Sequence, residues 1–297
     1  MLGRPRPHRK PPLRGPRVAA VGITTRARGR PLDAAAGRVL ATVLAWRMLA
    51  PMKAVILGAT KGIGRALARR MAARGDTLFL LGRTADDLAR SAADLSARSG
   101  AASVAGHAVC DLEDPSTFVP ALDAAQQALG RLDAVVVTAG LFASQAALEA
   151  DLELARRVLT VNFAHTVVFC EHAKAYLLAQ GGGILCAFSS VAGDRGRKPV
   201  VLYGASKAGL SAYLEGLDHR EHARGLRTVC IKPGFVRTGM TAGLREPPFA
   251  ADPDPVAATA LRAIDRAKPV AYAPGIWALV MAVIRRLPRF VMRRVQF

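Results

Sequence analysis

The sequence predicts an α/β fold in which a single parallel sheet is covered by helices on both faces. From Lys53 onward, short apolar runs alternate with amphipathic stretches of helical period. The alternation continues as far as residue 272, with neither an internal repeat nor a second domain. Strands that alternate with helices form right-handed βαβ units. We therefore expect one domain with a doubly wound sheet of about seven parallel strands.

Each element follows from its local sequence. The helix at 84–98 opens with Thr84 and Asp87, which are spaced like a capping pair. The helix at 115–129 has proline in its first turn. The expected strands are 53–57, 77–81, 103–109, 133–138, 183–189, 227–232 and 269–272. The expected helices are 65–74, 84–98, 115–129, 149–179, 203–224 and 254–267.

The positive charge is concentrated before the predicted domain. Residues 1–51 hold 11 Lys/Arg and one acidic residue, which gives +10 of the net charge of +20. This segment is rich in arginine and proline and does not build a core. It is compatible with a targeting segment or an anionic-surface tether, but Met52 opens directly into a strand, which favours translation starting there. The charge pattern lacks any nucleic-acid-binding motif, so nucleic acid is not an expected partner.

The four cysteines are widely spaced and none forms a CxxC pair. Three of them fall in apolar, strand-like runs, which favours small buried side chains over disulfides or metal ligands. Such use of cysteine is typical of a reducing compartment, and we expect a cytoplasmic protein. The residues are Cys110, Cys170, Cys186 and Cys230.

A glycine-rich turn follows the first strand and opens the first helix. Glycine lets the backbone turn tightly and approach a pyrophosphate, which the free N–H groups of the helix N-terminus then bind. With a strand before it and a helix after it, the pattern predicts a Rossmann-type dinucleotide site. The expected contacts are Gly58, Thr60, Lys61, Gly62, Ile63 and Gly64.

The end of the second strand predicts which dinucleotide binds. An acidic residue there would hold the ribose 2′-hydroxyl of NAD, but Arg83 occupies this position. Its guanidinium suits a 2′-phosphate, and Lys61 lies in the adjacent loop, so we expect NADPH. Asp111, followed by Leu112, ends the third strand and either accepts a hydrogen bond from the adenine or caps the next turn.

The residues Tyr203 and Lys207 are four apart, so they share one face of a helix. A nearby ammonium favours a phenolate, so we expect Lys207 to lower the pKa of Tyr203 and to fit it for proton transfer to a carbonyl oxygen. Ser190, upstream across a loop, can donate a hydrogen bond to the same oxygen.

Together these motifs resemble the short-chain dehydrogenase/reductase family over residues 52–275. The resemblance implies that Asn162 shapes the active site and holds a water linking Lys207 to solvent, and that Lys207 also binds the nicotinamide ribose. It further implies a homodimer or homotetramer. The remaining cofactor contacts that it implies are Ala139 and Gly140 after the fourth strand, and Pro233, Gly234, Val236 and Thr238 after the sixth.

The sequence departs from the family in one place. The usual Asn-Asn-Ala-Gly reads Val137-Thr138-Ala139-Gly140, which removes the asparagines that hydrogen-bond across the strands.

The second half of the chain is similar to reductases of decaprenylphosphoryl 2-keto-pentose, which implies a lipid-linked keto-sugar substrate. Arg195, Arg197 and Lys198, in the loop between Ser190 and Tyr203, are placed to meet its phosphate.

The C-terminal segment, residues 276–297, is an apolar run with Trp277 followed by arginines and no acid. This pattern predicts contact with the inner face of an anionic membrane, or alternatively a helix packed on the core or on another subunit.

The sequence thus predicts an NADPH-dependent reductase of a ketone. The substrate classes left open are the lipid-linked keto sugar and a 3-oxoacyl, steroid or xenobiotic carbonyl. An alternative of another class is an NADPH-binding sensor without turnover, although such a protein has no need of all four of Asn162, Ser190, Tyr203 and Lys207.

Overall fold

The computed structural model of the protein describes residues 51–295, and these form one sheet of seven parallel strands. The order is β3-β2-β1-β4-β5-β6-β7, so the direction of winding reverses between β1 and β4, where α/β proteins bind ligands. The expectation of about seven parallel strands is confirmed. The strands are β1 (Lys53–Leu57), β2 (Thr77–Gly82), β3 (Val104–Val109), β4 (Ala134–Val137), β5 (Gly183–Phe188), β6 (Leu226–Pro233) and β7 (Val270–Ala273).

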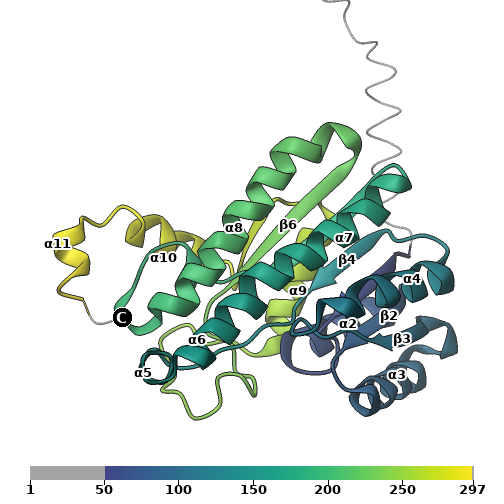
Figure 1. Ribbon diagram of the computed structural model, residues 1–297, viewed down its shortest axis with the longest axis horizontal. Helices are drawn as coiled ribbons and strands as arrows, with labels where there is room; N and C mark the ends of the chain where they lie inside the picture. The colour runs from purple at the N-terminus through teal and green to yellow at the C-terminus, as the bar shows by residue number, and fades with distance from the viewer. Residues whose placement is uncertain (1–50, 296–297) are drawn as a thin grey trace, which may run out of the picture. The chain divides into compact units, whose positions relative to one another are not determined.

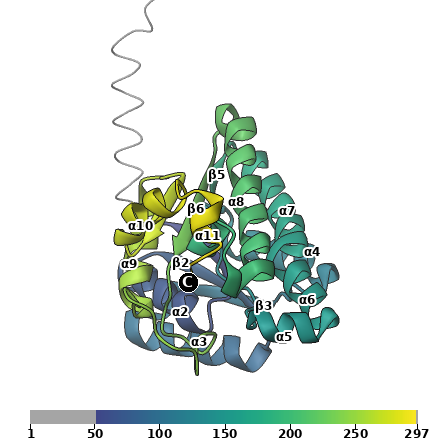
Figure 2. The same cartoon turned by 90° about the vertical axis from the view of Figure 1, so that its left-hand side faces the viewer.

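Helices cover both faces of the sheet (Figures 1 and 2). Side chains alternate along a strand, so Ile56 packs in the core on one face while Val55 and Leu57 pack on the other. The first face is covered by α2 (Gly62–Ala73), α3 (Ala85–Ser99) and α9 (Pro253–Asp265), and the second by α4 (Phe118–Leu129), α7 (Thr166–Ala179) and α8 (Val201–Glu221). Burial on both faces explains why the strands read as continuous apolar runs.

The expectation of one long helix at 149–179 is wrong. The segment holds α5 (Gln145–Ala150), α6 (Leu152–Leu159), a π-helical turn at Thr160–His165, and then α7. The Asp151 carboxylate accepts from the backbone N–H groups of Glu153 and Leu154, both at 3.0 Å, and so begins a new helix. Apolar periodicity runs through such a junction because neighbouring helices can present the same face to the core.

The capping pair expected at the start of α3 is also wrong. Thr84 is the N-cap residue, but its side chain makes no capping hydrogen bond. The Asp87 carboxylate instead contacts Lys61 Nζ at 3.2 Å and Arg90 Nη2 at 2.5 Å. The carboxylate that would have accepted a hydrogen bond at the start of the helix is bound by these two cations instead.

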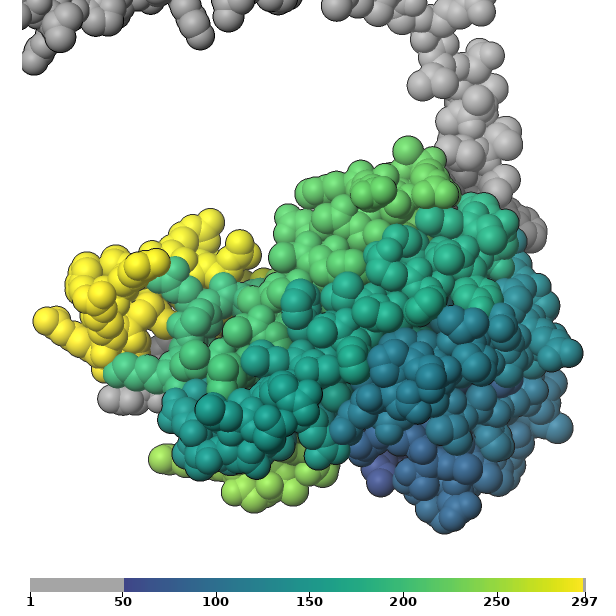
Figure 3. Space-filling model, viewed as in Figure 1, coloured from purple at the N-terminus to yellow at the C-terminus, as the bar shows by residue number. Residues whose placement is uncertain are grey.

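The C-terminal segment packs one face on the domain. It contains α10 (Ile276–Ile284) and α11 (Arg289–Met292). Trp277, Met281 and Ile284 are buried against Val191, the residue after Ser190. Figure 3 shows this segment in yellow, beside the green surface of the domain. Within residues 51–295, no helix combines the length and apolar character that crossing a membrane requires.

Two further expectations concern burial and the N-terminal segment. All four cysteines are buried and unpaired, which confirms their assignment as small buried side chains. The expectations for residues 1–51 fall almost wholly on residues 1–50, which lie outside the described part of the chain.

The packing of Phe169 on the second face of the sheet predicts how much stability is lost when its side chain is removed. Phe169 is fully buried and meets Phe118 edge-on, with ring centroids 5.5 Å apart. Replacing Phe169 with alanine should lower the free energy of unfolding by about 3–5 kcal/mol, measured by urea denaturation. Val168→Ala, at an exposed neighbour in the same helix, is the control and should change it by less than about 0.5 kcal/mol. Equal losses in the two variants would contradict this packing.

Candidate active site

The glycine-rich turn brings backbone close to backbone at the end of β1. A Cβ on Gly58, where φ is +94°, would lie 2.6 Å from Thr138 Oγ1. A Cβ on Gly64 would lie 2.1 Å from the carbonyl oxygen of Gly58. No side chain caps the start of α2 and its first turn holds no acidic residue. The N–H groups there are thus left for an anionic ligand, and the turn fits a dinucleotide pyrophosphate.

The departure from the family's asparagine motif is compensated by Thr138. Its hydroxyl lies 3.0 Å from the carbonyl oxygen of Leu57 and 3.1 Å from that of Gly58. This bridges β4 to the end of β1. The strand-stabilising role that the asparagines would fill is therefore carried by a threonine, and Ala139 follows without a bulky side chain.

The residues predicted at the adenosine end gather after β2 and β3. Arg83 is exposed, and its Nη1 lies 3.4 Å from Glu113 Oε1. Asp111 caps its own turn, because its carboxylate accepts from the Glu113 N–H at 3.0 Å. The carbonyl oxygen of Leu112 lies 2.7 Å from His165 Nδ1, which ties this turn to the π-helical turn.

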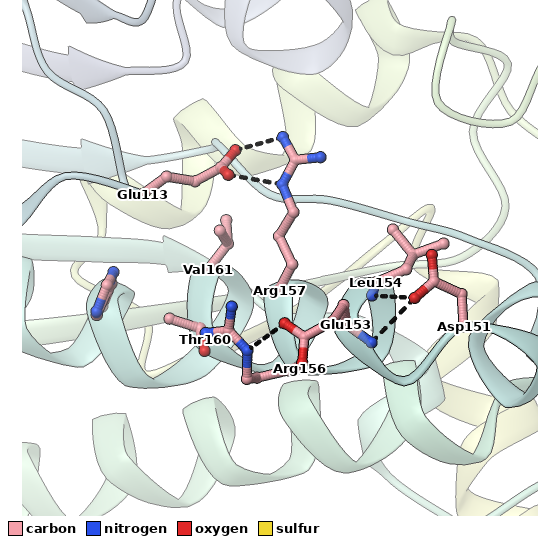
Figure 4. A pocket seen from close by; sticks show the side chains of 9 residues that line it. Glu113, Asp151, Glu153, Leu154, Arg156, Arg157, Thr160 and Val161 are labelled. Atoms are coloured by element: carbon pink, nitrogen blue, oxygen red, sulfur yellow. Dashed lines mark hydrogen bonds and ion pairs between the residues drawn. The ribbon is translucent and has the colours of Figure 1, made fainter.

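A cavity of about 390 Å³ lies beside this turn, between Glu113 and the helix α6 (Figure 4). A second cavity, of about 470 Å³, lies under the loop after β6, where Phe235, Thr238 and Leu244 line it. Neither cavity is lined by Ser190 or Tyr203, so these two predicted catalytic residues lie outside both cavities.

The π-helical turn presents Asn162 to the interior. Its side chain is fully buried, with Oδ1 accepting from the Leu141 N–H and Nδ2 donating to the Leu141 carbonyl, both at 2.7 Å. The extra residue of a π-turn re-aims one side chain, and such turns are frequent at functional sites. Asn162 thereby fixes the chain just after Gly140.

Ser190 and Tyr203 are brought together by two glycines that the sequence analysis did not single out. A Cβ on Gly193 would lie 2.7 Å from the backbone nitrogen of Ala208. A Cβ on Gly204 would lie 2.8 Å from the carbonyl oxygen of Ala192. The loop after β5 thus rests directly on α8. Gly193 follows Ser190 by three residues and Gly204 follows Tyr203 directly, so their positions in the sequence could have predicted this close contact.

Lys207 and Asn162 converge on the turn after β4. Lys207 is 5% exposed, and its ammonium donates to the carbonyl oxygen of Phe188 at 2.9 Å. A Cβ on Gly140 would lie 3.0 Å from Asn162 Oδ1 and 3.5 Å from Lys207 Nζ. Gly140 therefore leaves the space in which these two side chains meet, and a larger residue there would press on the Asn162 amide.

The expected effect of Lys207 on Tyr203 is wrong in this structure. Burial raises the pKa of Tyr203 to about 12, and the opposing influence comes from the Ser190 hydroxyl. Burial also lowers the pKa of Lys207 to about 8. The ammonium lies 5.9 Å from the centroid of the Tyr203 ring, directed to the carbonyl of Phe188. Desolvation disfavours the charged form of each group and is the main cause of both pKa shifts.

Of the predicted contacts after β6, Thr238 lies beside the glycine-rich turn, and the others pack on the domain. The Thr238 methyl group lies 3.2 Å from the position of a Cβ on Gly62. Pro233 ends β6, and a Cβ on Gly234 would lie 1.9 Å from Trp277 Nε1. Val236 is buried and pairs with Ala251 in an isolated bridge. The C-terminal helix α10 therefore packs on this wall, which agrees with the alternative of a helix packed on the core; its contact with Gly234 was not predicted.

The loop between Ser190 and Tyr203 is held by groups that the sequence did not reveal. Asp194 accepts from Lys232 Nζ at 2.5 Å and from the Tyr272 hydroxyl at 2.6 Å. Arg195 donates from Nη2 to the carbonyl oxygen of Leu287 at 2.7 Å, so it ties this loop to the C-terminal segment. Arg197 differs, because none of residues 51–295 accepts a hydrogen bond from its buried Nε.

The chain is similar to several oxidoreductases. The family model described as short chain dehydrogenase matches residues 52–248. An uncharacterized oxidoreductase of Mycobacterium tuberculosis is 37% identical over 243 residues, covering 81% of this chain and 95% of the relative. A short-chain dehydrogenase/reductase structure from Mycobacterium ulcerans has a TM-score of 0.67 at 22% identity, covering 82% of this chain and 97% of that one. A short chain dehydrogenase from Shigella flexneri, complexed with NADP, has a TM-score of 0.67 at 25% identity, covering 76% and 98%.

The fold and these similarities define an NAD(P)-dependent oxidoreductase with one Rossmann-type domain. More particularly, the chain belongs to the short-chain dehydrogenase family.

The buried ammonium of Lys207 predicts a pH dependence of stability. Its pKa falls from 10.5 to about 8 on folding, so between these values the unfolded chain binds a proton that the folded chain has released. Stability conferred at this site should therefore rise with pH from about 8 to about 10. Lys207→Met should lack this rise, measured as Tm against pH beside the exposed Lys198→Met control. Parallel curves for Lys207→Met and the unmodified protein would contradict the lowered pKa.

Proposed function

We propose that this chain is an NADPH-dependent reductase that converts a ketone to an alcohol at Ser190, Tyr203 and Lys207. One observation carries the proposal: these residues and Asn162 meet at the carboxyl ends of the strands, beside a turn that fits a dinucleotide. Bound NADPH supplies the hydride for the carbonyl carbon. The chain's own residues supply the proton and stabilise the charge on oxygen.

Tyr203 acts as the proton donor. Because burial raises its pKa to about 12, the phenol holds its proton at neutral pH. Ser190 donates a hydrogen bond to the same carbonyl oxygen as negative charge develops there. The lysine pKa of about 8 leaves Lys207 mostly charged at pH 7, and its ammonium is held by the Phe188 carbonyl at 2.9 Å, where the family resemblance has it bind the nicotinamide ribose. Asn162 holds the neighbouring backbone in place.

Selection of NADPH rests on Arg83 and Lys61. Arg83 stands directly after β2, where an acid would favour NAD, and its guanidinium is 57% exposed. Lys61 Nζ is exposed in the adjacent turn, with Asp87 as an ion-pair partner at 3.2 Å. A 2′-phosphate carries the charge that both cations suit.

For the ketone we propose a lipid-linked keto sugar bearing a phosphate. Arg197 supports this, because its half-buried guanidinium enters none of the ion pairs among residues 51–295 and burial lowers its pKa. The Asp194 carboxylate that attracts it already accepts from Lys232 and Tyr272. A buried cation without a bound counter-charge is costly, and a substrate phosphate would supply one. A 3-oxoacyl, steroid or xenobiotic ketone would leave Arg197 without this role.

We also propose that the outer face of α10 contacts an anionic lipid surface at the inner face of the membrane. Leu279 and Val283 are 66% and 58% exposed, on the side of the helix opposite Trp277 and Met281. Five arginines follow α10, and no acidic residue follows Asp265. An exposed apolar stripe flanked by cations, without acids, matches the interface of an anionic bilayer. The arginines are Arg285, Arg286, Arg289, Arg293 and Arg294.

The chemistry is tested with the full-length protein in mild detergent. NADPH consumption would be followed with a polyprenylphosphoryl 2-keto-pentose, a 3-oxoacyl thioester and a ketosteroid. We expect turnover of the keto sugar, a loss of at least about a hundredfold in Tyr203→Phe, and nearly unchanged NADPH binding by calorimetry. Tyr213→Phe, on the same helix, is the matched control and should retain activity.

Turnover of only the thioester or steroid would keep the mechanism and remove the keto sugar. NADPH binding without turnover of any ketone would favour a cofactor sensor, and full activity in Tyr203→Phe would remove Tyr203 as the acid.

The lipid surface is tested by vesicle flotation. Leu279→Gln with Val283→Gln should weaken binding to phosphatidylglycerol vesicles by about tenfold or more, because two apolar side chains lose their burial in the bilayer. The control carries Leu152→Gln with Val201→Gln, two exposed apolar residues elsewhere, and should bind as the unmodified protein does. Unchanged vesicle binding, or loss of an oligomer in place of vesicle binding, would overturn the membrane assignment.

A further inference from the structure

Glu113 is the one carboxylate among the described residues that pairs with Arg83. It lies in the turn after β3, and its side chain is 32% exposed. Its contact with Arg83 is long, at 3.4 Å between Oε1 and Nη1. If this pair closed, the guanidinium expected to receive a 2′-phosphate would instead be held by a carboxylate of the protein itself.

A second arginine occupies that carboxylate. Arg157 donates from Nε to Glu113 Oε2 at 2.6 Å and from Nη2 to Oε1 at 2.7 Å (Figure 4). Paired bonds of this kind join two planar groups and are stronger than a single contact. Arg157 is therefore the main ion-pair partner of Glu113. Most of the N–H donors of Arg83 stay available to another anion.

The position of Arg157 is fixed by the fold. It projects from α6, whose first turn is capped by Asp151 and whose inner face buries Ala155 and Val158. Figure 4 shows the side chain reaching across the cavity from this helix to Glu113. The same helix continues into the turn that carries Asn162, so the guanidinium stands on a rigid support.

We propose that Arg157 sets the preference for NADPH over NADH by neutralising Glu113 and leaving Arg83 available to the 2′-phosphate. This inference rests on the proposed use of NADPH. Arg157 acts through Glu113 and is a positioning residue. Without it, the Glu113 carboxylate would draw Arg83 toward itself and repel the phosphate, whereas NADH, which lacks the phosphate, would be affected little.

The test compares dissociation constants for NADPH and NADH, measured by calorimetry on the full-length protein at low salt. Arg157→Gln should weaken NADPH binding by about three- to tenfold and leave NADH binding within about twofold. Arg156→Gln is the matched control. It removes the same charge from the adjacent position, but its partner is Glu153, at 2.8 Å. This control should leave the NADPH/NADH ratio unchanged.

Rescue separates masking of Glu113 from simple loss of a cation. Glu113→Gln combined with Arg157→Gln should restore the NADPH/NADH ratio to within about twofold of the unmodified protein, because no carboxylate remains to be masked. The effect of Arg157→Gln should also shrink at high salt. Failure of the rescue, or an equal effect of Arg156→Gln, would overturn the inference.

Arg83→Gln distinguishes this inference from the proposal on which it rests. Loss of NADPH preference in Arg83→Gln but not in Arg157→Gln would overturn the role of Arg157 and keep the phosphate site. Unchanged preference in Arg83→Gln would remove the phosphate site itself.

Discussion

The site depends on direct contact between the backbone of the loop after β5 and that of α8. Gly193 and Gly204 allow this contact, since a Cβ at either position would meet backbone atoms at less than 3 Å. Without it, Ser190 would stand away from the helix that carries Tyr203 and Lys207. The spacing of tyrosine and lysine needs only a helix, but the serine is brought to them by packing that leaves no room for a methyl group.

Burial determines the hydrogen-bond partners and the pKa values of the polar groups at the site. Lys207 and Asn162 are almost or wholly enclosed, and each is satisfied by main-chain groups, at Phe188 and Leu141. Buried polar groups with fixed partners have defined positions, which the proposed proton transfer requires. The same burial explains the pKa values of Tyr203 and Lys207, since desolvation disfavours the charged form of both.

The elements that could be predicted from the sequence were those that alternating apolar runs encode. The bounds of β1 and the glycine turn followed from local pattern alone, because buried parallel strands are continuous apolar runs. The break at Asp151 and the π-turn at Asn162 could not be predicted in this way, since a cap and a single extra residue leave the apolar face continuous. The pairing of Glu113 with Arg157 joins positions far apart in sequence, and no spacing rule reveals it.

The hydrogen bonds to Asp194 join the loop after β5 to the last two strands of the sheet. Lys232 comes from β6 and Tyr272 from β7, an edge strand with no predicted catalytic residue. The final strand therefore serves as a brace for the loop that begins at Ser190. A chain shortened before Tyr272 would lose a hydrogen bond that holds this loop, so the part of the chain that shapes the site includes β7.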